Sequence, residues 1–195
     1  MSRGTRTILG FGASSMQGVG DSQGGFFARL TRQLQPAHPD WTFVNLGIGG
    51  DTTSDMLKRI DAVEAHRPFT SVIILGCNDV PRDNDRSPDR RNSPADYLAN
   101  LESIFAKLYT PGSLFIASFP SDGTRSGVQR VTMDRYIIPA TALARRFGFA
   151  VWDLYSEMKA NSALPDLWAS DGNHFNDAGH AMIAERVVGM LRTNP

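Results

Sequence analysis

The chain has 195 residues, 41% of them apolar and 21% charged, a composition typical of a globular domain and not of a disordered chain. Its 20 basic and 20 acidic side chains cancel, so the basic excess expected of a nucleic-acid-binding protein is missing. We therefore expect one domain over residues 1–195 that acts on a small molecule.

Segments that would direct the chain to a membrane or out of the cell are not recognised. The first residues have neither the apolar stretch nor the cleavage pattern of a signal peptide, and no apolar run is long enough for a membrane span. The one cysteine, Cys77, excludes an internal disulfide and suits a reducing compartment. We expect a cytoplasmic protein, and the sequence leaves its oligomeric state open.

Short apolar segments alternate with segments of helical period. The predicted strands are 7–11, 41–46, 71–75, 114–117 and 150–154. The predicted helices are 24–34, 53 to just before Pro68, 94–108, about 128–147 and 176–191. Two polar loops, 80–93 and 121–127, separate the later elements.

This alternation predicts parallel strands joined by right-handed crossovers, in a three-layer α/β/α sandwich. A flavodoxin-like strand order, 2-1-3-4-5, would put the first strand of the five-stranded sheet between the second and third. Function in such sheets lies at the carboxyl ends of the strands. Four small or polar turns fall on that edge, at Ser14, Gly50, Asn78 and Asp171.

The turn Ser170-Asp171-Gly172-Asn173-His174 carries a carboxylate and an imidazole three residues apart. The Asp171 carboxylate can accept a hydrogen bond from His174 Nδ1, which leaves Nε2 free as a base. Acyl transfer also needs a nucleophile, and Ser14 follows the first strand at a sharp turn of small residues.

Donors for the oxyanion of acyl transfer are also available. The backbone N–H groups of Ser14 and Gly50 and the side-chain amide of Asn78 form such a set. Glycine at position 50 would let the backbone approach a substrate closely.

These residues resemble those of a known family, the SGNH hydrolases, also called GDSL lipases and esterases. Four sequence blocks match in the family's order, from residue 8 to residue 191. The matching segments are Gly12-Ala13-Ser14, Asn45 to Thr52, Gly76 to Asp79, and Asp171 with His174. The resemblance implies Ser14 as nucleophile, a catalytic triad with Asp171 and His174, and an oxyanion hole of Ser14, Gly50 and Asn78.

Two positions depart from the family pattern. The aspartate that precedes the family's nucleophile is Ala13, which removes a carboxylate from the turn but no member of the predicted triad. The proline that often follows the family's histidine is Phe175, which would change the stiffness of the loop or close off part of the pocket.

Each residue also has a simpler interpretation. Ser14 and Ser15 could cap the first helix and Asp171 the last, and the glycines near position 50 or the pair Asn78-Asp79 could be ordinary turn residues. The complete set of roles favours the catalytic interpretation over these. We predict that the remaining histidines, His38, His66 and His180, lie at the surface. The loop from Arg82 to Arg91 is expected to be a solvated rim, with a smaller chance that it contacts a polar substrate.

Other binding chemistries fit less well. The Gly10-x-Gly12 pair suggests a dinucleotide-binding loop, but Ser15 stands where that motif has its third glycine, and no phosphate-binding lysine follows. The histidines lack metal-ligand spacing with Cys77 or with each other.

We therefore predict a serine hydrolase that cleaves carboxylic esters through an acyl-enzyme on Ser14, without a metal or organic cofactor. The expected substrate is a small ester, either a short-chain acyl ester, an acetylated sugar or a thioester. The alternative is a non-catalytic module that binds carbohydrate or acyl groups on the same fold.

Overall fold

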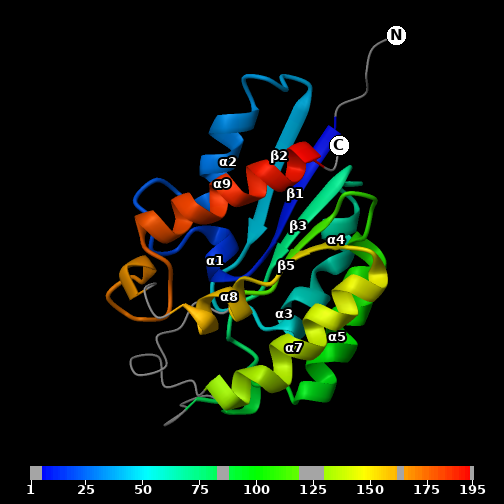
Figure 1. Cartoon of the computed structure of the whole chain (residues 1–195). Coiled ribbons are helices and arrows are strands. Elements are labelled where there is room, and N and C mark those ends of the chain that lie inside the picture. The colour runs from blue at the N-terminus through cyan, green and yellow to red at the C-terminus, as the bar shows by residue number, and fades with distance from the viewer. Residues whose placement is uncertain (1–5, 83–87, 119–129, 162–164, 194–195) are drawn as a thin grey trace.

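A computed structural model describes residues 6–82, 88–118, 130–161 and 165–193. Its centre is a sheet of five parallel strands in the order β2-β1-β3-β4-β5 (Figure 1), which confirms the predicted flavodoxin-like order. The strands are β1 (Arg6–Gly12), β2 (Trp41–Gly47), β3 (Thr70–Ile74), β4 (Leu114–Ile116) and β5 (Ala150–Trp152).

The register of the three strands β2, β1 and β3 brings their carboxyl ends level. Gly12, at the end of β1, is paired with Gly47 of β2 on one side and with Ile74 of β3 on the other. The loops that follow these strands therefore begin side by side on one edge of the sheet.

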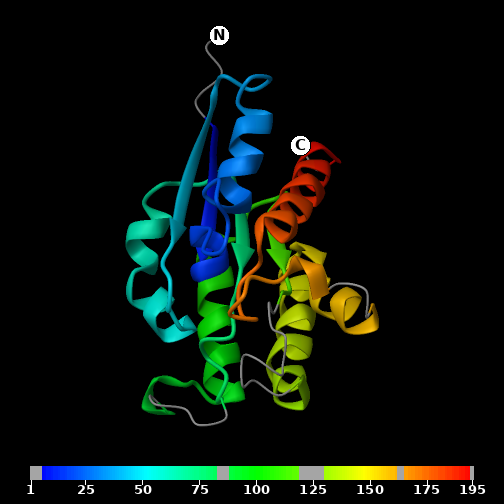
Figure 2. The same ribbon diagram turned by 90° about the vertical axis from the view of Figure 1, so that its left-hand side faces the viewer.

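Helices cover both faces of the sheet, so the molecule has three layers (Figures 1 and 2). One hydrophobic cluster joins the sheet to α1 (Ser14–Gln17), α2 (Gly25–Leu34) and α9 (Asp177–Thr193). The other joins it to α3 (Thr53–Lys58), α4 (Ile60–Glu64), α5 (Pro94–Leu108) and α7 (Arg130–Phe147). At the end of β5, α8 (Leu154–Ala160) contributes Leu154 to the first cluster and Tyr155 to the second. The short helices η1 (Pro88–Arg90) and η2 (Pro165–Leu167) lie in connecting segments.

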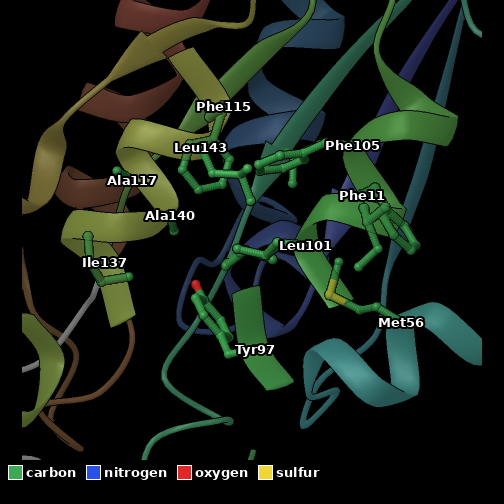
Figure 3. Packing of buried hydrophobic residues seen from close by; sticks show 14 of the residues in the cluster. Phe11, Met56, Tyr97, Leu101, Phe105, Phe115, Ala117, Ile137, Ala140 and Leu143 are labelled. Atoms are coloured by element: carbon green, nitrogen blue, oxygen red, sulfur yellow. The ribbon is translucent and has the colours of Figure 1, made fainter. Parts of the chain in front are cut away.

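Helix α5 illustrates how the sequence builds these layers. Ser93 caps its amino end by accepting a hydrogen bond from the backbone N–H of Asp96, and Pro94 occupies the first turn, where its missing N–H costs nothing. Side chains three and four residues apart then face the sheet (Figure 3), where Phe105 packs edge to face on Phe115 of β4 at 5.2 Å between ring centroids. Burying each large apolar side chain contributes roughly 1.5–3 kcal/mol.

Several element boundaries differ from the predictions. The helix predicted from residue 53 to before Pro68 is two helices, because α3 ends and α4 begins at Arg59, whose φ of −112° and ψ of 9° are not helical. The fifth strand ends at Trp152, and α1 and α8 were not predicted. Residues 83–87 of the first polar loop, all of the loop 121–127 and residues 128–129 lie outside the described residues.

The prediction that His180 lies at the surface is wrong, because its side chain is fully buried in α9. The His180 Nδ1 accepts a hydrogen bond from the backbone N–H of Phe26, and Nε2 donates to the carbonyl oxygen of Val19. A buried imidazole with both nitrogens bonded joins α9 to the segment that follows Ser14. Within the described ranges, no helix has the length and apolar character of a membrane span.

Candidate active site

Ser14 is the first residue of α1 and follows directly from β1. Neither Ser14 nor Ser15 is a helix cap: Ala13 precedes α1 and Gly24 precedes α2, without a side-chain cap in either case. The capping interpretation of these serines is therefore wrong. At the amino end of α1 the backbone N–H of Ser14 is a first-turn donor that needs no partner within the helix.

The segment after β2 lies against this turn. A Cβ placed on Gly49 would be 3.9 Å from the Cβ of Ser14, and the Gly49 N–H donates to Oε1 of Gln17 in α1 at 2.8 Å. Gly50 has a φ of +85°, a backbone conformation that disfavours any side chain, with no atom near the position of a Cβ. The left-handed turn therefore explains why position 50 is a glycine.

Asn78, which follows β3, joins the same group. Its Nδ2 donates to the carbonyl oxygen of Asp51 at 2.8 Å. A side-chain amide has two N–H bonds, so one remains for a further acceptor. We call Ser14, Gly49 to Asp51 and Asn78 the strand-end wall.

The Asp171–His174 turn contains the hydrogen bond that its sequence predicts. His174 Nδ1 lies 2.6 Å from Asp171 Oδ2, and Oδ1 of Asp171 accepts the backbone N–H groups of Asn173 and His174 at 2.9 and 3.0 Å. Partial burial raises the pKa of the Asp171 carboxyl, but these hydrogen bonds outweigh it and lower the pKa to about 2. An ionised Asp171 at Nδ1 selects the tautomer in which Nε2 carries no proton and can accept one.

Asp171 does not cap the last helix, contrary to its simpler interpretation. Helix α9 begins at Asp177, and Asn176 Oδ1 accepts the backbone N–H of Gly179 at 3.0 Å, as an N-cap does. The carboxylate of Asp171 is thus committed to its own turn.

Two contacts hold this turn near the strand-end wall. Gly20 follows α1 with a φ of +96°, and a Cβ there would collide with the carbonyl oxygen of Phe175 and lie 3.2 Å from the Cβ of His174. Asn173 Oδ1 accepts a hydrogen bond from the Cys77 thiol at 3.1 Å, next to Asn78. Burial raises the pKa of that thiol, although the nearby Arg82 opposes the effect, so the thiol stays protonated and can donate.

Phe175 lies in the core, so the prediction that it would close off part of the pocket is wrong. Its side chain is fully buried and its ring stacks on Trp168 with 5.1 Å between centroids. Packing of these rings stiffens the segment that leads into α9.

Asp79, the last residue of the third family block, has a structural role that the sequence does not predict. Its side chain is 3% exposed, and its carboxylate accepts the backbone N–H of Thr53 at 2.9 and 3.1 Å and the Thr53 hydroxyl at 2.6 Å. Asn92 Nδ2 donates to the same carboxylate. Burial raises the pKa of Asp79 despite these donors. The carboxylate therefore ties the end of β3 to the start of α3.

Among its described residues, the arginine-rich loop is partly the predicted solvated rim and partly bonded to the backbone of the strand-end wall. Arg91 Nη1 donates to the carbonyl oxygen of Asn78 at 2.5 Å, and Arg90 Nη2 donates to that of Gly50 at 3.3 Å. Pro88, Asp89 and Arg90 are exposed, as a solvated rim should be, with 59% of the Arg90 side chain accessible. These backbone contacts are not indicated by the pattern of charges along the chain.

The fold thus gathers Ser14, Gly50 and Asn78 on one wall and places the Asp171–His174 pair on a turn that is hydrogen-bonded to Cys77, next to that wall. Among the described residues, no hydrogen bond joins Ser14 Oγ to His174 Nε2, and such bonds often form only when substrate is bound. The described residues also include no group of three or more His, Cys, Asp or Glu side chains that could hold a metal ion.

Comparisons with known proteins agree with this fold. The chain is similar to a lipase/acylhydrolase from Enterococcus faecalis, with a TM-score of 0.83, 24% identity and coverage of 96% of each chain. It is also similar to an acetylxylan esterase from Geobacillus stearothermophilus, with a TM-score of 0.77, 23% identity and coverage of 96% and 94% of the two chains. At these identities the likeness shows the fold.

Sequence comparison adds the family. Esterase TesA of Pseudomonas aeruginosa is 33% identical over 110 residues, which cover 56% of this chain and 50% of TesA, so the chain spans about half the length of that relative. The model of the GDSL-like Lipase/Acylhydrolase family matches residues 11–182, from the end of β1 into α9. The chain therefore belongs to the GDSL-like lipase/acylhydrolase family, the SGNH group of carboxylic ester hydrolases.

Proposed function

We propose that this chain is a serine esterase that hydrolyses short-chain carboxylic esters through an acyl-enzyme on Ser14. The observation that carries the proposal is the 2.6 Å contact between His174 Nδ1 and Asp171 Oδ2, on a turn that packs against the segment following Ser14. That contact leaves Nε2 as the proton acceptor a serine nucleophile requires.

In the first half of the reaction, His174 Nε2 removes the proton of Ser14 Oγ as the oxygen attacks the ester carbonyl carbon. The negative charge that develops on the carbonyl oxygen is stabilised by the N–H groups of Ser14 and Gly50 and by the second N–H of Asn78 Nδ2. The intermediate then expels the alcohol, which takes the proton from His174, and the acyl group remains on Ser14.

In the second half, His174 removes a proton from water, and the hydroxide attacks the acyl carbon. The same N–H groups stabilise the second oxyanion. Its collapse breaks the bond to Ser14 Oγ, which recovers the proton from His174, and the carboxylic acid leaves. Asp171 stays ionised throughout and orients the imidazolium form of His174.

The proposed preference for short acyl chains rests on the composition of the two loops expected at the active edge. The sequences of loops 80–93 and 119–127 are rich in Asp, Arg, Ser and Pro, and they contain no long apolar insertion. A longer acyl chain would gain about 0.8 kcal/mol per CH₂ only where each methylene is fully buried. We therefore expect acetyl to butyryl esters to be preferred, with thioesters and acetylated sugars as further candidates within that size.

The proposal is tested with p-nitrophenyl esters from acetyl to palmitoyl, an acyl thioester and acetylated xylo-oligosaccharides. The last substrate is included because structural relatives are acetylxylan esterases. We expect kcat/KM to be highest between acetyl and butyryl. A steady rise from acetyl to palmitoyl would contradict the short-chain proposal.

The nucleophile is tested in the same assays. Ser14→Ala should abolish hydrolysis and labelling by an activated phosphonate, while Ser15→Ala should keep both, since the Ser15 hydroxyl is buried and has no hydrogen-bond partner among the described residues. Activity lost in Ser15→Ala and retained in Ser14→Ala would overturn the assignment. Wild-type protein that turns over none of these esters would favour the non-catalytic binding module.

A further inference from the structure

Arg59 lies at the break between α3 and α4, on the side of the sheet opposite α1. Its guanidinium lies over the Phe11 ring of β1, with 4.5 Å from Cζ to the ring centroid. The side chain is 21% exposed. A long cationic side chain held this far inside the fold needs several acceptors.

These acceptors come from three separate segments. Arg59 Nη1 donates to the carbonyl oxygen of Leu46 in β2 at 2.8 Å, and Nη2 donates to that of Gly12 at the end of β1 at 3.3 Å. Nε and Nη2 lie 2.9 and 2.7 Å from Oδ2 of Asp51, whose side chain is 14% exposed. One guanidinium thus binds the strand that leads to Ser14, the strand that leads to Gly50, and Asp51 itself.

Asp51 connects this arginine to the proposed oxyanion donors. The Asp51 carboxylate accepts a hydrogen bond from Arg59, and the Asp51 carbonyl oxygen accepts one from Nδ2 of Asn78 at 2.8 Å. Asp51 also directly follows Gly50 in the chain. The position of Asp51 therefore sets both where the Asn78 amide points and how the Gly50 backbone is presented.

We propose that Arg59, acting through Asp51, is a positioning residue for the oxyanion donors Asn78 and Gly50. The inference rests on the proposed esterase function. Oxyanion stabilisation needs donors fixed before the charge develops, and a small displacement of such donors reduces the rate far more than it reduces substrate binding. Lysine keeps the charge but has no planar fork, so it cannot bind two carbonyls and a carboxylate together.

The test compares Arg59→Lys and Asp51→Asn with a matched control, Arg29→Lys. Arg29 pairs with Asp21 at 2.6 Å and its side chain is 15% exposed, so this pair is buried to a similar degree, but it contacts no member of the strand-end wall. We expect Arg59→Lys and Asp51→Asn each to lower kcat by about 10- to 100-fold with KM within about twofold. Arg29→Lys should lower the melting temperature and leave kcat per folded molecule within about twofold.

Two further readouts separate positioning from general support of the fold. Affinity for a trifluoromethyl ketone, which forms an oxyanion on the nucleophile, should fall in parallel with kcat. Arg59→Lys should cost clearly less in kcat when Asn78 is already alanine than in wild type, because one of the two donors that Arg59 positions is then absent and only Gly50 remains. Should Arg59→Lys fail to fold, Asp51→Asn carries the same expectations, since it keeps the backbone carbonyl that binds Asn78.

The inference is overturned if both variants keep wild-type kcat, or if their losses multiply with that of Asn78→Ala. Its failure is distinguishable from failure of the proposed function, which would appear as undiminished hydrolysis by Ser14→Ala. If Ser14 is the nucleophile and Arg59→Lys is fully active, only the positioning role is wrong. If Ser14 is not the nucleophile, both proposals fall.

Discussion

The strand-end wall is joined by bonds between residues distant in sequence, whereas the Asp171–His174 turn is closed by bonds within three residues. Asn78 and Asp51 are 27 positions apart and Arg59 and Gly12 are 47 apart, while the imidazole and carboxylate of the turn are three apart. Asp79 is buried beside the wall, but the Asp171 side chain is half exposed. The wall therefore belongs to the folding core, and the turn is a local structure placed upon it.

This difference has a consequence for mutations. A change in the wall removes contacts that join strands and helices, so it should affect both stability and activity. A change in the turn removes contacts that solvent can partly replace, so it should affect activity with little effect on stability. The following predictions test this separation.

The largest effect is expected from the turn. Asp171→Asn should lower kcat/KM by about 10³- to 10⁴-fold, because an amide at this position favours the wrong tautomer of His174. The free energy of unfolding should change by less than about 1 kcal/mol, since the side chain is half exposed. Steady-state kinetics and urea unfolding measure both quantities.

The control is Asp61→Asn on α4. It removes an exposed ion pair with Lys107 of α5 and should keep full activity. Activity within tenfold of wild type would remove Asp171 from the triad.

The next effect concerns the amide of the wall. Asn78→Ala should lower kcat by about 10²- to 10³-fold with KM nearly unchanged, the usual result of removing one preorganised donor. Asn100→Ala removes an amide that donates to the hydroxyls of Thr53 and Ser54, away from the wall, and serves as the control. A large fall in melting temperature with normal kcat per folded molecule would make Asn78 a structural residue only.

A third variant tests stability at Asp79, which is buried beside the wall. Asp79→Ala should lower the free energy of unfolding by about 3 kcal/mol, because the buried N–H and hydroxyl of Thr53 and the amide of Asn92 lose their acceptor. Asp79→Asn should be milder, since it keeps one acceptor oxygen and removes a charge whose burial is unfavourable. Equal stability of Asp79→Ala and wild type would show that the wall is not part of the folding core.

The smallest expected effect is a pH dependence of folding stability at His180, which lies in α9 shortly after the Asp171–His174 turn. Burial lowers the pKa of His180, although its bond to the Val19 carbonyl and the nearby Asp21 oppose the shift. The unfolded chain therefore takes up a proton at this residue at a higher pH than the folded chain does. Stability contributed by neutral His180 is present above the unfolded pKa and is lost as pH falls below it toward the folded pKa.

Between pH 7 and pH 5, wild type should lose more stability than His180→Gln, which has no imidazole to protonate, as measured by urea unfolding at each pH. The other histidines are common to both proteins and cancel in the comparison. Parallel pH profiles of the two proteins would contradict the prediction. Hydrogen exchange at pH 5 should show loosening around α2 and α9 before any around the strand-end wall.

Local patterns predicted the strand order, which the fold confirms, and proposed the residues of the candidate site. Alternating apolar segments mark the strands and helices, and short connections restrict how parallel strands can be ordered. The contact between Asp171 and His174 could be predicted because a separation of three residues on a tight turn fixes its geometry. The family blocks added the roles proposed for Ser14, Gly50 and Asn78, which their own turns do not reveal.

Other features were determined only by the tertiary structure, because they involve contacts between segments that the sheet brings together. The helix break at Arg59, the burial of Asp79 against Thr53 and the bond between Cys77 and Asn173 each involve residues from different elements. His180 is a different case, because Ile183, Ala184 and Val187 follow it at helical spacing and all lie on the buried face of α9 that packs on α2. The helical period of the sequence therefore indicates its burial. Hydrogen bonding and burial of polar side chains depend on which segments meet in space, and a sequence pattern reports only neighbours along the chain.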